Sequence, residues 1–361
     1  MRIFIDIGHP AHVHYFKNAI NILENKGHEF LITARNKDVA ISLLKYNKFK
    51  FYNRGKGANG ILGKFFYLFR ANIKLLKLAK KFKPDIFLSF TSPYVAQVSK
   101  IIGKPHISFD DTEHAKLGIL SFAPFTESIL TPKCFTKDFG KKHIRFDGYM
   151  ELCYLHPNYY KPDQSILNLL NVQKDEKYVI LRFVSWKANH DIGHKGLLLE
   201  NKILAVKEFS KYAKVFVSSE GKLPETLDKY HIDIPPERMH DALAFTELLF
   251  GESSTMASEC SILGTPSIFI DNDGRGYTFE QEKSYSLVHN FTESAEDQRK
   301  AIAKGIEILK SGKSHGNFKA SSLRLINDKI DVNRFMVWYI ENYPKSDKIM
   351  KDNPDYQYRF K

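Results

Sequence analysis

The chain has 361 residues, of which 43% are hydrophobic and 26% are charged. This is the composition of a packed globular protein, and the length exceeds what one hydrophobic core usually serves, so we expect two domains. The formal net charge of +13 would attract phosphorylated substrates, an anionic membrane surface or nucleic acid, and a solvated basic surface gives the same value. Charge alone therefore selects no partner.

Cysteine usage and hydropathy bear on location. Cys134, Cys153 and Cys260 are widely spaced and form no CxxC pair, which argues against a disulfide framework and a zinc site. The first apolar run reaches Asp6 too early for a secretory signal. No uncharged apolar run approaches the ~18–20 residues that cross a bilayer. We expect a cytoplasmic protein.

Short apolar runs alternate with helical stretches through the first half of the chain. This βαβ alternation is typical of a parallel sheet covered by helices on both faces, with about six or seven strands. The expected strands lie at residues 2–6, 29–33, 49–52, 85–90, 105–109 and 128–131, and the expected helices at 10–26, 37–46, 61–82 and 93–102.

A second alternation follows residues 148–163, an irregular stretch with two prolines that is typical of an interdomain connection. Its strands are expected at 178–183, 215–218, 248–250 and 267–270, and its helices at 199–212, 256–263 and 295–311. A last helix, 332–343, precedes a charged tail and either caps the second domain or crosses back to the first. We expect domains at residues 1–155 and 156–330, with 331–361 holding the last helix and the tail.

The loop GESSTMASE, residues 251–259, leaves an apolar strand and opens a helix. Its small residues leave backbone N–H groups open to an anion, and the helix dipole favours a phosphate there. Ser253, Ser254 and Thr255 are candidate diphosphate ligands, and Glu259, just over one turn further, can accept hydrogen bonds from ribose hydroxyls. The alternative is an ordinary N-cap by Ser253 or Ser254 with an exposed Glu259.

The loop IGHPAHVH, residues 7–14, follows the first strand. Pro10 suits the first helical position, which puts His9 and His12 near a helix N-terminus at the ligand-binding edge of the sheet. A neutral histidine suits general-base work, so we predict His12 as the base. Loop and packing roles are the alternative. No carboxylate or cysteine cluster completes a metal site, so no metal is expected.

Two further loops concentrate polar groups at strand ends. SFDDTEH, residues 108–114, brings Asp110, Asp111 and Glu113 together, and paired carboxylates can act as a base or bind hydroxyls. The alternative is capping of the next helix by Asp111 or Thr112. The second loop, RFVSWKANHDIGH, offers three candidate phosphate or sugar ligands and a tryptophan that either stacks or packs. These are Arg182, Lys187, His190 and Trp186.

The helix at 61–82 carries apolar residues on two adjacent faces, and charged residues share the second face. One is the expected buried stripe, formed by Phe65, Phe69, Asn72, Leu76 and Ala79. The adjacent face, formed by Phe66, Arg70, Ile73 and Lys77, would expose aromatic and basic groups together. Such a face can lie in an anionic membrane interface. The alternative is two packed faces with a solvated lysine edge.

At these loops the chain resembles a family of archaeal and bacterial proteins of unassigned function, described as predicted glycosyltransferases. The resemblance covers most of the chain and rests on DIGHPAHVHYFKNAINILENKGHEFLITAR, RFVSWKANHDIGHKGL, GESSTMASECSILGTPSIFI and GYTFEQEKSYSLV. It implies a GT-B fold, in which two Rossmann-like, doubly wound parallel-sheet domains face a central cleft.

That family is distantly similar to the transferase that adds N-acetylglucosamine to a lipid-linked cell-wall precursor and to the UDP-N-acetylglucosamine 2-epimerases. His12 falls where the transferase has a His-Val after a Gly-rich loop, although His9-Pro10-Ala11 replaces the glycines. Ser253 and Glu259 match a Ser-Gly stretch followed by a ribose-holding Glu. Gly8, His9 and Glu280 are further candidate nucleotide-sugar contacts.

In the epimerases, carboxylates in two successive loops transfer protons at the sugar. Asp110, Asp111 and Glu113 occupy the second place, whereas Thr91-Ser92 lacks the first carboxylate. The resemblance therefore implies a metal-independent glycosyltransferase without a cofactor, which moves a sugar from a UDP-type nucleotide sugar to a carbohydrate or lipid-linked acceptor in surface polysaccharide or glycolipid synthesis. The alternatives are a 2-epimerase and a non-catalytic nucleotide-sugar binding protein. Peripheral contact with the anionic inner membrane face is expected, and nucleic acid binding is not.

Overall fold

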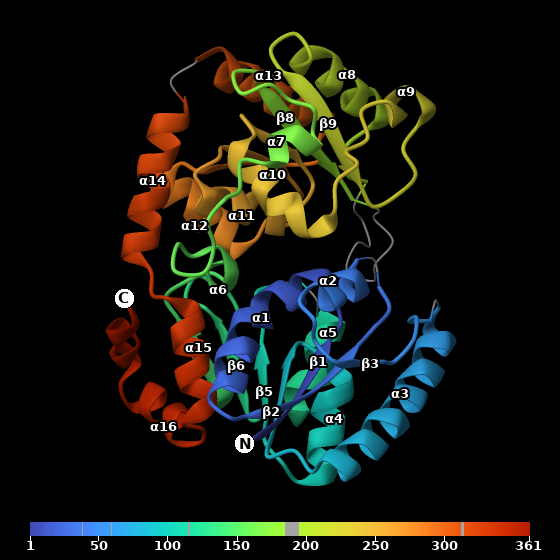
Figure 1. The fold of residues 1–361 in the computed structure, drawn as a ribbon, viewed down its shortest axis with the longest axis vertical. Helices are drawn as coiled ribbons and strands as arrows, with labels where there is room; N and C mark the ends of the chain where they lie inside the picture. Colours follow the sequence, from blue (N-terminus) through green and yellow to red (C-terminus); the bar gives the residue numbers. More distant parts are fainter. Residues whose placement is uncertain (38, 59, 115, 185–194, 312–313) are drawn as a thin grey trace. The chain divides into compact units, whose positions relative to one another are not determined.

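The computed structural model describes residues 1–37, 39–58, 60–114, 116–184, 195–311 and 314–361. The chain divides into two compact units (Figure 1). Unit 1 comprises Met1–Tyr154 and Lys329–Lys361, and unit 2 comprises Leu155–Asp328. Each unit contains one sheet in which the paired strands run parallel, so the predicted α/β class with two parallel sheets is confirmed.

Unit 1 has a seven-stranded sheet in the order β3-β2-β1-β4-β5-β6-β7. The order reverses beside β1, because β2 and β3 are added on one side and β4 to β7 on the other. Ligands of open α/β sheets bind at the carboxyl ends of the strands at such a switch point. The strands are β1 (Arg2–Ile7), β2 (Glu29–Ala34), β3 (Phe51–Asn53), β4 (Ile86–Phe90), β5 (His106–Phe109), β6 (Ser128–Pro132) and β7 (His143–Phe146).

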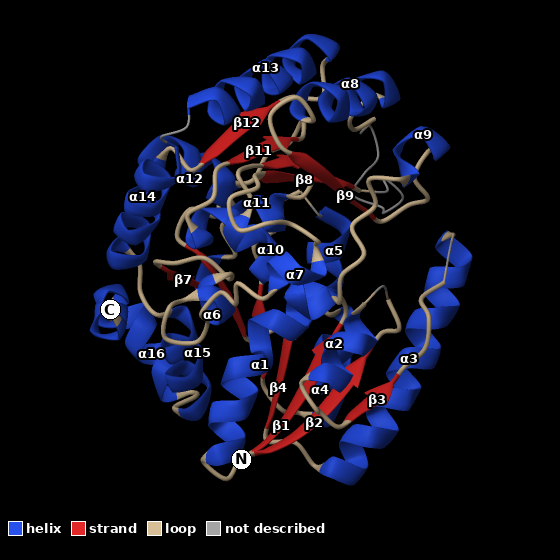
Figure 2. Cartoon of the chain, turned by 45° about the horizontal axis from the view of Figure 1, so that its top comes forward, coloured by secondary structure: helices blue, strands red, loops and turns tan. Residues whose placement is uncertain are grey.

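Helices cover both faces of this sheet (Figure 2). Phe4 of β1 and Phe87 of β4 pack with Leu75 of α3 and Val95 of α4 in one buried cluster. On the other face, α1 packs against α15. The helices of unit 1 are α1 (Pro10–Asn25), α2 (Ala40–Tyr46), α3 (Ile61–Phe82), α4 (Pro93–Ile102), α5 (Lys116–Phe122), α15 (Val332–Glu341) and α16 (Lys345–Asp352), and α6 (Leu152–Leu155) leads into unit 2.

Unit 2 has a five-stranded sheet in the order β12-β11-β10-β8-β9, so its switch point lies between β8 and β10. Buried side chains of α8 and α13 pack against one face of this sheet and form a hydrophobic core with the strand residues. The strands are β8 (Tyr178–Phe183), β9 (Lys214–Ser219), β10 (Leu249–Gly251), β11 (Ser267–Ile270) and β12 (Val288–Phe291). The helices are α7 (Ile166–Leu169), α8 (Leu199–Phe209), α9 (Glu225–Asp228), α10 (Met239–Phe245), α11 (Ser254–Leu263), α12 (Gly276–Tyr285), α13 (Ala295–Ser311) and α14 (Ser314–Asp328).

The buried stripe of α3 differs from the expected one. Phe69 is 66% exposed, so its predicted burial is wrong. Among the described side chains of α3, the buried ones are Ala71, Leu75 and Ala79, which lie four residues apart and face the sheet. This register turns Phe69 outward. The side chain of Phe65 lies outside the described part of the helix.

The segment after α15, expected to be a charged tail, is folded. It forms α16 and a 3₁₀ helix, Pro354–Phe360. Aromatic packing explains the difference, because the rings of Trp338 and Tyr356 lie 5.0 Å apart and those of Phe335 and Phe360 lie 5.8 Å apart. These contacts bury aromatic surface and so stabilise the folded segment. In the sequence, the many charged residues of the segment had suggested a tail.

Candidate functional site

The loop after β1 begins α1 at the switch point of unit 1. Pro10 takes the first helical position, as predicted, and the Nδ1 of His9 caps the helix by accepting from the Ala11 N–H at 3.3 Å. The Gly8 N–H donates to His12 Nδ1 at 3.2 Å. A nitrogen that accepts a hydrogen bond cannot carry a proton, so neutral His12 has its proton on Nε2.

The surroundings keep His12 neutral. Burial holds its pKa well below the usual value, and the positive charges of Lys37 and Arg54, with that of His9 whenever His9 is protonated, act in the same direction. In this arrangement His12 offers an N–H at Nε2. The base role predicted from the sequence requires an acceptor hydroxyl to replace the backbone N–H at Nδ1.

A buried ion pair beneath this loop escaped the sequence analysis. Asp6 Oδ1 accepts from Arg54 Nε at 2.9 Å and from Thr33 Oγ1 at 2.7 Å, and Asp6 Oδ2 accepts from Ser92 Oγ at 2.6 Å. A Cβ added to Gly8 would lie 3.9 Å from Arg54 Nη2, so the guanidinium reaches the β1 loop. The only sequence signal was an acidic residue inside an apolar strand, which implies a buried partner without identifying it.

Three buried carboxyl groups follow β5. Asp110 is fully buried; its Oδ1 accepts from the Thr112 N–H at 2.9 Å, and its Oδ2 has no hydrogen-bond partner among the described residues. Burial raises the pKa of Asp110 well above its usual value, and the charges of Asp111 and Glu113 raise it further. Asp111 Oδ2 lies 3.4 Å from the hydroxyl of Tyr15, which connects this cluster to α1.

The capping role weighed for this loop does not occur, because α5 begins at Lys116 and neither Asp111 nor Thr112 precedes it directly. The structure instead gathers His12 and the carboxyl cluster around α1. The ring of Tyr15 lies 6.1 Å from that of His12, and its hydroxyl contacts Asp111. The two loops predicted separately thus form one edge of unit 1.

In unit 2, α11 begins beside the switch point. A Cβ at Gly251 of β10 would lie 2.0 Å from the carbonyl oxygen of Arg182 in β8, so glycine is required for the approach of these strands. Ser253 caps α11, with its Oγ accepting from the Met256 N–H at 3.3 Å. This is the N-cap weighed as the alternative for this loop, and the anion-binding role of the first turn stays a prediction.

Ser254 and Thr255 occupy that first turn and are half-buried. Further along α11, Glu259 is 5% exposed, so the alternative of an exposed glutamate is wrong. Its Oε1 lies 2.9 Å from Nε2 of His240 in α10, a partner that the sequence analysis missed. Glu280 is half-buried on α12, a helix that packs on α11.

The guanidinium of Arg182 faces β9. Its Nη1 donates to Ser218 Oγ at 2.8 Å and its Nη2 to Glu220 Oε1 at 2.7 Å. Arg182 is therefore engaged with the neighbouring strand and not with α11. Lys187 and His190, together with Trp186, lie outside the described residues.

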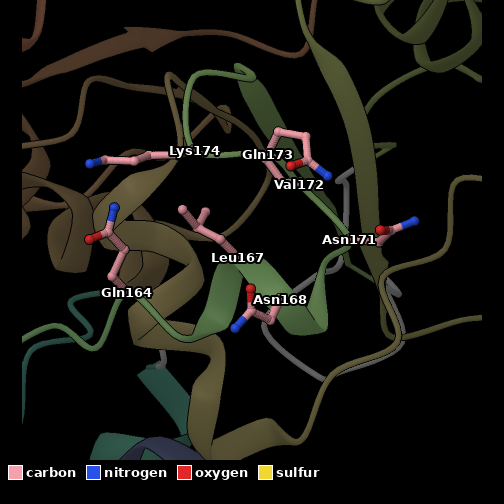
Figure 3. Close-up of a pocket in the computed structure, with 7 residues that line it drawn as sticks. All are labelled: Gln164, Leu167, Asn168, Asn171, Val172, Gln173 and Lys174. Atoms are coloured by element: carbon pink, nitrogen blue, oxygen red, sulfur yellow. The ribbon is translucent and has the colours of Figure 1, made fainter.

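Other features of the described residues contribute less. A cavity of about 470 Å³ in unit 2 is lined by α7 and the loop that follows it, including Asn168 and Gln173, and contains no predicted site residue (Figure 3). The part of the chain that the structure describes contains no group of three His, Cys, Asp or Glu side chains that could hold a metal ion. Among the described helices, none combines the length and the hydropathy of a membrane-spanning segment.

Comparison with known sequences gives a family without an assigned activity. Residues 1–275 match the family described as "Protein of unknown function (DUF354)". An uncharacterized protein of Methanocaldococcus jannaschii is 26% identical over 277 residues, which cover 74% of this chain and 80% of that protein.

Comparison with solved structures gives the fold. The UDP-GlcNAc 2-epimerase of Neisseria meningitidis, solved bound to UDP-GlcNAc, is 13% identical, with a TM-score of 0.65 and coverage of 88% of this chain and 94% of that one. A glycosyltransferase of Streptomyces sp. SF2575 is also 13% identical, with a TM-score of 0.61 and coverage of 95% and 100%. The predicted GT-B type of fold is confirmed, and it is shared with nucleotide-sugar enzymes of both kinds.

Proposed function

The chain belongs to the DUF354 family, and from its two sheet edges we propose that it is an enzyme that transfers a sugar from a nucleotide sugar to an acceptor. The observation that carries the proposal is α11, whose N-terminus opens at a switch point and which holds a buried carboxylate, Glu259, just over one turn further.

Unit 2 supplies the donor site in this proposal. The N–H groups of Ser254 and Thr255 and the dipole of α11 bind the diphosphate, and the same groups stabilise the charge that develops on it as it leaves. Glu259 accepts hydrogen bonds from the ribose hydroxyls, with His240 holding the carboxylate in place at 2.9 Å. We take the nucleotide to be UDP, which the Neisseria neighbour binds as UDP-GlcNAc.

Unit 1 supplies the chemistry at the acceptor. His12 is neutral and lies at the carboxyl edge of the sheet, where it contacts the acceptor hydroxyl. As general base, it takes the hydroxyl proton at Nδ1 after the Gly8 N–H is displaced. The attacking oxygen then forms the bond to the sugar carbon as the diphosphate departs.

A second candidate, epimerisation at the sugar, is favoured by the carboxyl cluster after β5. Because burial raises the pKa of Asp110 well above its usual value, this group can hold a proton and deliver it to carbon. Thr91-Ser92 provides no carboxylate at the end of β4, which supports transfer over epimerisation.

One incubation separates these functions. The protein is mixed with UDP-GlcNAc in D₂O, with and without a membrane extract as acceptor source. Transfer releases UDP only with acceptor; epimerisation yields a deuterated product without it; a binding protein leaves the sugar nucleotide unchanged. Deuterated product in the absence of acceptor would overturn the transferase proposal.

We also place the acceptor at a membrane surface, and the protein in the cytoplasm against the inner membrane face. On α3, Phe66 is 67% exposed, Phe69 66% and Ile73 41%, and Arg70 and Lys77 lie exposed on the same stretch of helix. Rings of this kind enter the headgroup region while the cations meet anionic phosphates. A lipid-linked acceptor would be reached from that position.

A further inference from the structure

Nearly all of the net charge of the chain comes from one segment of unit 1. Residues 39–84 contain twelve lysines and arginines and no aspartate or glutamate, in a chain of net charge +13. The segment runs from α2 through β3 and α3. A concentration of this kind produces a strong local field that attracts phosphate-bearing ligands.

Within this segment the structure contains a cavity of about 580 Å³ between residues 53–58 and the first half of α3. We call it the α3 pocket. Its wall includes four cationic side chains, Arg54, Lys56, Arg70 and Lys74, and its described lining residues include no carboxylate. The volume is in the range of pockets that hold small organic ligands.

Arg54 is the fixed element of the α3 pocket. It is 7% exposed, its Nε donates to Asp6 at 2.9 Å, and its Nη1 donates to the hydroxyl of Tyr67 at 2.9 Å. The guanidinium also lies 4.2 Å from the ring centre of Tyr94. A guanidinium held on three sides loses little conformational entropy when it binds an anion.

The other three cations are at the rim. Lys56, Arg70 and Lys74 are exposed, and none of them forms an ion pair with a described residue. Lys74 Nζ donates to the carbonyl oxygen of Asn53 at 2.5 Å, which holds its charge over the pocket. An anion that binds these three cations therefore displaces no described carboxylate from them.

Aromatic groups form the rest of the wall. Tyr67 and Phe66 line the α3 pocket, and Phe66 leads to Phe69, the next exposed ring on α3. The pocket thus combines a cationic interior with an apolar exit. Its chemistry matches a phosphate group attached to an apolar chain.

We propose that the α3 pocket binds the phosphate of a phosphorylated acceptor whose apolar part lies along Phe66 and Phe69. This inference rests on the proposed transferase function, because the bound phosphate compound is an acceptor only if the protein transfers a sugar to it. Arg54 connects the two sites, because its Nη2 lies 3.9 Å from the Cβ position of Gly8 in the loop that holds His12. A bound phosphate would then position an acceptor hydroxyl near that loop.

The test uses three probes on the full chain: inorganic pyrophosphate, hexyl phosphate, and phosphatidylcholine vesicles that contain phosphatidic acid. Hexanol and pure phosphatidylcholine vesicles serve as uncharged controls. The pocket variant is Arg70→Ala with Lys74→Ala. The matched control is Lys80→Ala with Lys81→Ala, which removes the same charge from the same helix outside the pocket.

We expect hexyl phosphate to bind the wild type and the pocket variant to raise its Kd roughly tenfold or more, as the loss of charge-assisted hydrogen bonds predicts. The control variant should change the Kd less than about threefold, by long-range charge alone. Stronger binding of hexyl phosphate than of pyrophosphate would identify the phosphate ester as the ligand; the reverse order would overturn the apolar part of the proposal.

Equal losses in both variants would show a diffuse basic surface and overturn the pocket. Binding of vesicles alone, with no binding of hexyl phosphate, would also overturn it and leave only a membrane contact.

UDP affinity is measured in the same samples. Hexyl phosphate binding without UDP binding would refute the transferase function and leave the α3 pocket as a phosphate site. UDP binding without hexyl phosphate binding would refute the α3 pocket and leave the transferase function. Arg54→Lys keeps the charge but removes the planar guanidinium that can donate two hydrogen bonds to one phosphate. This variant should weaken hexyl phosphate binding in a folded protein.

Discussion

His240 Nε2 lies 2.9 Å from Glu259 Oε1, and each of these residues is only 5% exposed. The pair joins α10 to α11, the helices that precede and follow β10. A buried carboxylate is stable only with hydrogen-bond partners, so His240 fixes the orientation in which Glu259 can meet a ligand.

This pair yields the first prediction. Glu259→Ala should weaken binding of UDP by roughly tenfold or more, because a hydrogen bond to a charged group is worth ~1.5–3 kcal/mol. Calorimetric titration with UDP measures the change. Glu259→Gln is the control, since it keeps the shape and loses the charge, and it should lie between the wild type and Glu259→Ala. Unchanged affinity in a folded Glu259→Ala protein would make the pair purely structural.

The second prediction concerns His12. His12→Ala should lower turnover by about a hundredfold or more while nucleotide binding stays within about threefold, because a base acts mainly in the transition state. His12→Gln separates the two possible roles. Glutamine can donate a hydrogen bond but cannot take a proton, so it restores activity only if His12 acts as a donor through Nε2. Recovery of turnover in His12→Gln would refute the base.

The same residue has a pH signature. Because burial and nearby cations hold the pKa of His12 well below the usual value, His12 stays neutral as the pH falls through 6.5. Turnover governed by His12 should therefore persist below that pH and decline only further down. A pH profile of kcat on UDP-GlcNAc measures this. A half-maximal point at about 6.5 that disappears in His12→Gln would contradict the burial argument.

A stability prediction follows from His106. Its ring is fully buried between Ser89 Oγ and Thr126 Oγ1, each 2.9 Å away, and burial lowers its pKa to about 3. At pH values between about 3, the pKa of His106 in the folded protein, and 6.5, its pKa in the unfolded chain, the unfolded chain binds a proton that the folded chain does not. His106 alone should thus lower the free energy of unfolding by about 2 kcal/mol from pH 7 to pH 5, and by more toward pH 3.

Urea unfolding at several pH values measures this slope. His106→Asn should reduce the slope by about one proton between pH 6.5 and pH 3, since the other histidines are unchanged. An identical slope in a folded His106→Asn protein would show that another group is responsible. Above pH 7, His106 should contribute no pH dependence.

The last prediction concerns the outer face of α3. Phe66→Ser with Lys77→Glu should reduce sedimentation with anionic vesicles at low salt, because it removes one exposed ring and reverses one charge. Leu199→Ser with Lys207→Glu makes the same kind of change on α8 of unit 2, where Leu199 is 52% exposed, and should have little effect. Equal binding by both variants would reject α3 as the membrane contact.

Local signals explain which parts of the fold could be predicted. Pro10 at the first position of α1 acts within one turn, so its pattern identified that helix start, whereas for α11 the pattern left Ser253 and Ser254 as alternative caps and the structure selects Ser253. The register of α3 could not be read in the same way, because its apolar residues occupy two adjacent faces. Burial of Leu75, and not Phe69, depends on the sheet beneath the helix.

The candidate site shows the same limit. Spacing placed Glu259 correctly on α11, but its partner His240 lies on a separate helix and carried no local signal. Likewise, Asp6 and Arg54 are 48 residues apart and meet only when β1, β2 and β3 pair. Contacts of this kind depend on the topology of the sheet.

The return of Lys329–Lys361 to unit 1 makes unit 2 an insertion within the sequence of unit 1. Lys329 Nζ pairs with Asp147 Oδ1 at 2.8 Å, so the chain re-enters unit 1 close to the segment from which it departs. During synthesis, the first 154 residues leave the ribosome without α15, the helix that packs on α1. Unit 2 can complete its own sheet first, and unit 1 closes only after all of unit 2 has been made. A nascent chain halted before residue 329 would therefore lack the helix that packs on α1.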